Sequence, residues 1–203
     1  MNKLVAICML VGLMSTGAVN AAVTLTFDEL PTQPVDGLSY NGVTFGFTVG
    51  GYPSTDATYN GIGPGDLVYL QDTTLEGTTA GILTLNFETP TDVLEFGVAL
   101  NSYETVAPAY VVRLYDPSYT LIDTYYGNTS PLVLWSEGQY TYSGTTVGRA
   151  VIGFNEQAAS RFALDNLTFN PGNSTNPIPA PGAVFLGGFG LGLVNWLRRR
   201  RTL

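Results

Sequence analysis

The stretch that decides the fold is residues 82–100, ILTLNFETPTDVLEFGVAL, in which apolar and polar residues alternate. Every second residue from Leu83 to Phe87, and again from Leu94 to Leu100, is large and apolar. Successive side chains of a β-strand point to opposite faces, so a period of two places one face of each segment in a core. The stretch therefore predicts two half-buried strands.

Similar runs occur along the rest of the chain, separated by Gly, Pro, Asn and Asp. They lie at residues 23–27, 40–49, 67–70, 109–115, 121–126, 132–135, 139–142, 149–154 and 161–169. None of this part has the 3.6-residue periodicity of an amphipathic helix. We predict an all-β domain over residues 22–169, a single antiparallel β-sandwich of jelly-roll type. In the last run the alternation slips by one residue at Asp165-Asn166, which predicts a β-bulge.

The amino-terminal segment, residues 1–21, has the features of a secretory signal peptide. Lys3 precedes an apolar core at residues 4–14, and the small residue Ala21 ends the segment. We expect signal peptidase to cleave after Ala21.

The carboxy-terminal segment combines three elements in a fixed order. A proline-rich linker, residues 170–181, ends in the motif Pro179, Ala180, Pro181. An apolar run over residues 182–197 follows, and the basic cluster Arg198, Arg199, Arg200 and Arg201 closes it. Sixteen helical residues rise about 24 Å against a hydrocarbon core of about 30 Å, so a helix here would just span a membrane. The arginines would hold its far end in the cytoplasm.

This order of elements resembles the PEP-CTERM sorting signal of Gram-negative bacteria, although Ala180 stands where family members usually carry an acidic residue. The resemblance implies that residues 182–203 anchor the chain transiently in the inner membrane. An exosortase-type enzyme would then cut near the Pro motif and pass the protein to the cell surface or extracellular matrix. The alternative is an uncleaved tail anchor.

The composition of residues 22–169 excludes several kinds of chemistry. Sixteen carboxylates stand against three arginines, a net charge of −13, which disfavours nucleic acid as a partner. This part contains no histidine, lysine or cysteine, so it has no Ser-His-Asp triad, Schiff-base lysine or histidine-ligated zinc. We predict that the protein is not an enzyme. Glycoside hydrolysis by two carboxylates is the distant alternative.

The two ends of the domain suggest a metal site. An acid near the start, Asp28 or Glu29, and Asp165 in the last run are similar to positions in carbohydrate-binding modules of jelly-roll fold. There the first and last strands lie side by side and such acids hold a structural calcium ion. The resemblance implies a Ca²⁺ site at Asp28, Glu29 and Asp165, completed by backbone carbonyls and water. The alternative is that these acids cap local turns and the bulge.

Aromatic residues suggest a ligand surface. Tyr125, Tyr126, Trp135 and Tyr140 are crowded into one stretch beside polar residues, and sugar rings stack on such aromatic planes. The alternative is that each tyrosine occupies a half-exposed strand position. Two functions follow: a non-catalytic module that binds exopolysaccharide, or a structural matrix or adhesion protein without a small-ligand site.

Overall fold

The computed structural model describes residues 21–170, and they contain twelve β-strands. The strands are β1 (Val23–Leu25), β2 (Gln33–Pro34), β3 (Ser39–Tyr40), β4 (Val43–Val49), β5 (Tyr52–Pro53), β6 (Thr58–Gly61), β7 (Thr74–Thr78), β8 (Gly81–Leu100), β9 (Val106–Tyr115), β10 (Leu121–Leu132), β11 (Trp135–Phe154) and β12 (Arg161–Phe169). All pairings are antiparallel. The prediction of an all-β antiparallel fold is confirmed.

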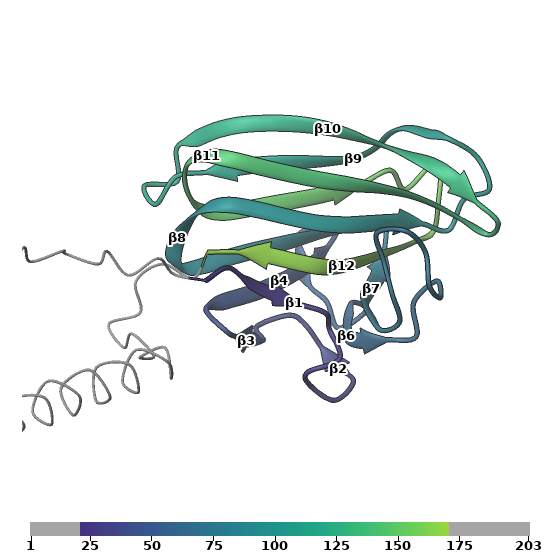
Figure 1. The fold of residues 1–203 in the computed structure, drawn as a ribbon, viewed down its shortest axis with the longest axis horizontal. Helices are drawn as coiled ribbons and strands as arrows, with labels where there is room; N and C mark the ends of the chain where they lie inside the picture. The colour runs from purple at the N-terminus through teal and green to yellow at the C-terminus, as the bar shows by residue number, and fades with distance from the viewer. Residues whose placement is uncertain (1–20, 171–203) are drawn as a thin grey trace, which may run out of the picture.

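The long strands β8 and β11 turn the hydrogen-bonded sheet back on itself. Residues 81–87 of β8 pair with β4, whereas residues 94–100 pair with β12. Strand β11 follows β8 through both halves, with register shifts between Ser143 and Arg149. Figure 1 shows the two strands turning together at one end of the molecule. The result is a sandwich of two layers.

We call the layers sheet I and sheet II. Sheet I consists of β3, β4, residues 81–87 of β8, residues 149–154 of β11, β9 and residues 121–129 of β10. Sheet II consists of residues 135–143 of β11, residues 93–100 of β8, β12, and then β1 and β7 with β6 and β2 beyond (Figure 1).

The core lies between the layers and contains the alternating residues that the sequence predicts. Phe47 of sheet I lies 6.0 Å from Phe162 of sheet II, and Phe87 lies 5.3 Å from Phe169, between ring centroids. The buried hydrophobic residues lie between Leu25 and Phe169, and β1 pairs with β12. The core of the described residues and its closing strand pair thus lie within residues 22–170, so we expect this segment to fold on its own.

The predicted bulge in the last strand is also confirmed. The register of β12 against β8 shifts between Asp165 and Thr168, and Asn166 has a φ of 54°. The extra residue lets Leu164 and Leu167 both point into the core.

Two of the expected strands are not strands. Residues 67–70 belong to the connection between β6 and β7, and they pack as a loop on the outside of sheet II. Residues 132–135 form the turn between β10 and β11, with Val133 at a φ of 52°. Both runs are apolar but short, and such runs do not distinguish a strand from a loop that covers a sheet.

The predicted signal peptide, linker, sorting motif and anchor, residues 1–20 and 171–203, lie outside the described residues. Over residues 21–170 the structure contains no helix of the length and apolarity that a membrane crossing needs.

Candidate functional site

The outward positions of sheet I carry no acidic residue from Ile82 to Asn86 on β8 or on the strands beside them, and Glu88 is the next outward residue of β8. Buried and more exposed residues alternate along each strand, so the outward set can be read from burial and register. It consists of Thr44, Gly46 and Thr48 on β4, Ile82, Thr84 and Asn86 on β8, Arg149, Val151 and Gly153 on β11, Val111, Arg113 and Tyr115 on β9, and Thr124 and Tyr126 on β10. We call this surface the arginine face.

Two arginines lie on adjacent strands of this face, Arg113 on β9 and Arg149 on β11. Arg149 is opposite Tyr115 and Arg113 is opposite Val151, so the two arginines are diagonal neighbours on adjacent strands. Ordinary strand geometry places such positions about 7–8 Å apart. Arg149 Nε donates a hydrogen bond of 2.6 Å to Asn86 Oδ1, and its guanidinium lies 4.5 Å from the centre of the Tyr119 ring. Among the described residues, neither Arg113 nor Arg149 forms an ion pair.

A hollow of about 200 Å³ opens beside Tyr126 on the same side of the molecule. Its walls come from the start of β9 and the end of β11 and are mostly apolar. They consist of Pro108, Ala109, Tyr110, Val111, Tyr126, Gly153, Phe154 and Asn155. Tyr126 is 63% exposed, so most of its ring is available to a ligand.

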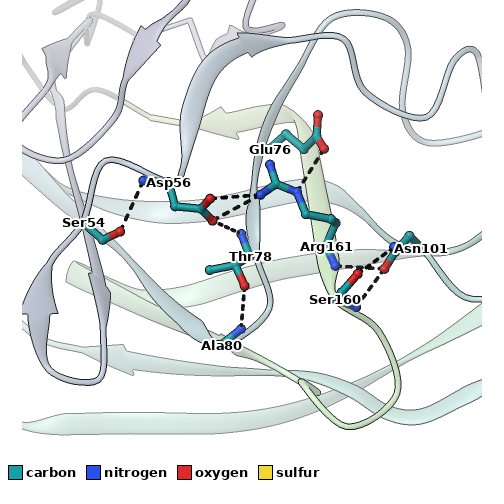
Figure 2. A network of polar contacts seen from close by, with 8 residues as sticks. All are labelled: Ser54, Asp56, Glu76, Thr78, Ala80, Asn101, Ser160 and Arg161. Atoms are coloured by element: carbon teal, nitrogen blue, oxygen red, sulfur yellow. Dashed lines mark hydrogen bonds and ion pairs between the residues drawn. The ribbon is translucent and has the colours of Figure 1, made fainter.

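The third arginine of the domain, Arg161, is paired within the fold. Figure 2 shows its guanidinium between Asp56 and Glu76, at 3.2 and 3.3 Å. Asn101 fixes the backbone beside it by accepting hydrogen bonds from the amides of Ser160 and Arg161. This arginine connects β12 with β7 and with the loop before β6, and its charge is already paired with two carboxylates.

The outer face of sheet II differs because a loop covers part of it. Leu70, in the β6–β7 loop, packs on Ala99 and Ala163, with Trp135 at the margin of this cluster. Glu137, 5% exposed, accepts hydrogen bonds from the amides of Val68 and Tyr69 at 3.1 and 3.0 Å. The small residues of the sheet leave space for the loop, and the carboxylate satisfies its buried amides.

Asp165 fastens the same loop from β12. It is 1% exposed and accepts hydrogen bonds from the amides of Gln71 and Asn166, at 2.8 and 2.6 Å. Burial raises the pKa of the Asp165 carboxyl to about 6, against the lowering effect of these two amides. The carboxylates of Glu29 and Asp28 add a smaller increase.

The proposed calcium ligands therefore lie in one neighbourhood, but donors within the fold already engage them. Thr26 Oγ1 donates to Asp28 at 2.7 Å, and the Thr26 amide donates to Glu29 at 2.8 Å. Tyr59 donates its hydroxyl proton to the second oxygen of Glu29. Within residues 21–170, no three or more His, Cys, Asp or Glu side chains gather as a metal ion would need. The bonds from the Thr26 amide to Glu29 and from the Asn166 amide to Asp165 are local caps of the kind that the turn-capping alternative describes, whereas Gln71 and Tyr59 reach these acids from distant segments.

The four aromatic residues that the sequence singles out do not come together. Tyr140 is 2% exposed and packs in the core on Phe96. Tyr125 lies at the open edge of the sandwich, 5.2 Å from Tyr140 between ring centroids. Trp135 lies with the loop on sheet II, and Tyr126 alone lies on the arginine face. Burial raises the pKa of the Tyr140 hydroxyl well above its usual value.

Sequence reasoning overlooked Arg113 and Arg149, although a signal was present. Arg113 stands between the apolar residues Val112 and Leu114, so it must point outward if they point inward. Arg149 precedes Ala150 and Ile152 in the same way. The sequence pattern does not show that β9 and β11 are neighbours, because this depends on the order of strands in the sheet.

Comparisons with known proteins give distant likenesses. No protein-family model matches the chain, and no curated protein matches it. Among solved structures, a family 29 carbohydrate-binding module matches at 10% identity and a TM-score of 0.37, over 75% of this chain and 90% of the module. A cleaved adhesin domain of Lys-gingipain from Porphyromonas gingivalis matches at 10% identity and a TM-score of 0.39, over 73% and 98%. The enzymatically active domain of a bacteriophage CBA120 tailspike protein matches at 16% identity and a TM-score of 0.35, over 67% and 21%. The function proposed below rests on this chain's own residues.

The raised pKa of Asp165 predicts a specific pH dependence of stability. Between about pH 4 and pH 6 the folded protein holds a proton that the unfolded chain has released. The free energy of unfolding should therefore fall as the pH rises through this window, and Asp165→Asn should remove this contribution. Urea unfolding of residues 22–170 at several pH values measures it as the difference between wild type and variant. Asp66→Asn, at an exposed loop carboxylate, is the control. A constant difference from pH 4 to pH 7 would contradict the prediction.

The same titration tests the calcium prediction in a second arm. A bound cation favours the ionised carboxylate, so millimolar Ca²⁺ should raise the melting temperature and move the pH effect of Asp165 downward. If the melting curves with calcium and with chelator superimpose, the calcium prediction is contradicted and the turn-capping alternative is favoured.

Proposed function

We propose that the chain is an exported surface or matrix protein whose jelly-roll-type sandwich binds an extracellular polysaccharide without catalysis. The observation that carries the proposal is the position of Tyr126. Its exposed ring lies beside a hollow on the arginine face. An aromatic plane accepts the apolar face of a sugar ring, and a pre-formed hollow limits the ordering that binding requires.

Export and sorting form the other half of the proposal. The signal peptide at residues 1–21 and the ordered motif, apolar run and arginines at residues 179–201 support it. The proposed partners are signal peptidase and an exosortase-type enzyme. Absence of histidine, lysine and cysteine from residues 22–169 supports a binding role over catalysis.

The structural matrix or adhesion role remains the second candidate, and one feature favours it. Strand β10 pairs with β9 along residues 121–129 and leaves its other edge open there, a surface on which another strand can add. Such a protein would need no sugar contact.

Replacing Tyr126 by Ala tests the binding role. Loss of the ring should weaken binding to the host's exopolysaccharide about tenfold, which corresponds to about 1.4 kcal/mol. The melting temperature should stay within a degree or so, because most of the ring is already in water. Affinity electrophoresis and thermal melting of residues 22–170 give the two readouts.

Tyr52→Ala is the matched control, since Tyr52 is 77% exposed but lies beyond β4, at the opposite side of sheet I. Equal binding by the two variants would remove the arginine face from the proposal. No binding by the wild type would leave the structural role.

A further inference from the structure

We infer that the arginine face recognises an anionic polysaccharide, one that carries carboxylate or sulfate groups, through Arg113 and Arg149. The inference deepens the proposed function and rests on it. It specifies the charge of the ligand, which the exposed ring and the hollow leave open.

The first step is that the fold pairs neither arginine with a carboxylate, since Arg149 contacts the neutral side chains of Asn86 and Tyr119. Like charges on neighbouring strands are unfavourable, and among the described residues no carboxylate forms an ion pair with Arg113 or Arg149, not even Glu88, two residues beyond Asn86 on β8. Arg161, in contrast, lies between two carboxylates. In a domain with sixteen acids, a pair of arginines that avoids them all leaves two guanidinium groups for an external anion.

The second step is that the geometry suits an extended chain. Tyr126 is opposite Val111 on β9, which makes it a diagonal neighbour of Arg113, and Arg113 is a diagonal neighbour of Arg149. Asn86 lies opposite Arg149 on β8 and holds its Nε. Three adjacent strands about 4.8 Å apart therefore present a ring and two guanidinium groups in one row, and Asn86 on the fourth strand orients Arg149. A guanidinium binds a carboxylate or sulfate through two parallel hydrogen bonds.

The third step concerns the negative charge of the rest of the domain. Charges on the outer face of sheet II and a ligand on the outer face of sheet I are separated by both layers, which is more than the Debye length of about 8 Å at physiological salt. The acids of sheet II are thus largely screened from a ligand on the outside of sheet I. Close contacts with Arg113 and Arg149 are screened much less.

The fourth step distinguishes a polysaccharide from a second copy of the chain. The acids on the outer face of sheet II already have partners in the fold: Glu137 and Asp165 hold the β6–β7 loop, Glu76 pairs with Arg161, and Glu95 accepts a hydrogen bond from Gln139. The oxygens of these carboxylates are already engaged within the fold, so this face offers the arginines of another copy few free carboxylate oxygens. The observations favour the polysaccharide.

The experiment compares a polygalacturonate oligosaccharide with the same oligosaccharide after reduction of its carboxyl groups, together with alginate, a sulfated dextran and neutral dextran. Calorimetry on residues 22–170 should show binding to at least one of the anionic glycans. If a uronate is the ligand, reduction of its carboxyl groups should weaken binding at least tenfold. Arg113→Gln and Arg149→Gln should each weaken binding to the anionic glycan at least tenfold. Arg113→Lys should give an intermediate loss, because lysine keeps the charge but lacks the planar fork.

Arg161→Gln is the control, since it removes the same charge from the other sheet and should leave the affinity unchanged. Thermal melting of each variant confirms that it is folded. Binding of neutral dextran that needs Tyr126 but neither Arg113 nor Arg149 would overturn the anionic ligand and leave the proposed function intact. Failure of every anionic glycan to bind would overturn the anionic ligand, and failure of the host's exopolysaccharide to bind as well would overturn both. Self-association that Arg113→Gln abolishes, measured by sedimentation, would assign the face to a second copy instead.

Discussion

Gly97→Ala should destabilise the domain by about 1–3 kcal/mol, although it adds one methyl group to a strand. A Cβ at Gly97 would lie 2.3 Å from the carbonyl oxygen of Tyr69, which is backbone and cannot rotate away. Either the strand shifts, at the cost of about 1–3 kcal/mol that overpacking brings, or the β6–β7 loop leaves the sheet. In the second case Leu70 is exposed and the hydrogen bonds to Glu137 are lost.

Gly46→Ala is the matched control. Its Cβ would lie 3.6 Å from Thr84 Cβ, an ordinary contact, so the smaller entropy of the unfolded chain should leave stability unchanged or slightly higher. Urea unfolding of residues 22–170 gives both free energies. Chymotrypsin, which cuts after aromatic residues such as Tyr69, should cleave the Gly97→Ala protein faster if the loop is released. Equal stability of the two variants would show that the loop does not lie against Gly97.

The sequence predicted the parts of the fold that depend on strict alternation. Leu83, Leu85 and Phe87 are buried as expected, because a one-residue shift would expose all three. The bulge at Asp165-Asn166 was also readable, since the inward set changes parity there. These features are local, and period-two patterns determine them.

The β6–β7 loop shows why the rest could not be read. Residues 67–70, LVYL, have the composition of a strand, but their burial depends on Ala99 and Ala163, which are distant in sequence. Glu137 likewise reads as an exposed strand carboxylate until the loop amides reach it. Tertiary contacts outweigh intrinsic preference at such positions.

The candidate site was predicted only in part for a related reason. Tyr125, Tyr126 and Tyr140 are the same residue type in similar surroundings. The alternation of a strand does not say which of its two sets of residues faces the core. Tyr140 points inward with Phe96, whereas Tyr126 points outward beside Arg113. The site is formed by neighbouring strands of sheet I. Its prediction would have required the order of the strands in the sheet as well as their positions in the sequence.

Replacing Arg198–Arg201 by serine should abolish correct processing of the carboxy terminus. The proposed anchor is barely long enough to span a membrane, so the arginines supply the stop. Each arginine at the membrane centre costs about 2.5–3.5 kcal/mol on insertion scales, and four together strongly oppose translocation of the tail. Without them the apolar run can pass through, and the motif Pro179–Pro181 is no longer held at the membrane where the sorting enzyme acts. Export through residues 1–21 should continue.

Mass spectrometry of the mature protein measures the result in wild-type cells and in cells that lack the exosortase-type enzyme. The wild-type chain should lose the residues that follow its Pro motif only when the enzyme is present. The serine variant should have the same unprocessed terminus in both strains. Replacement of the four arginines by lysine is the control, because it keeps the positive charge that orients the segment and should preserve processing. An identical mature terminus for the wild-type chain in both strains would contradict sorting and favour the uncleaved tail anchor.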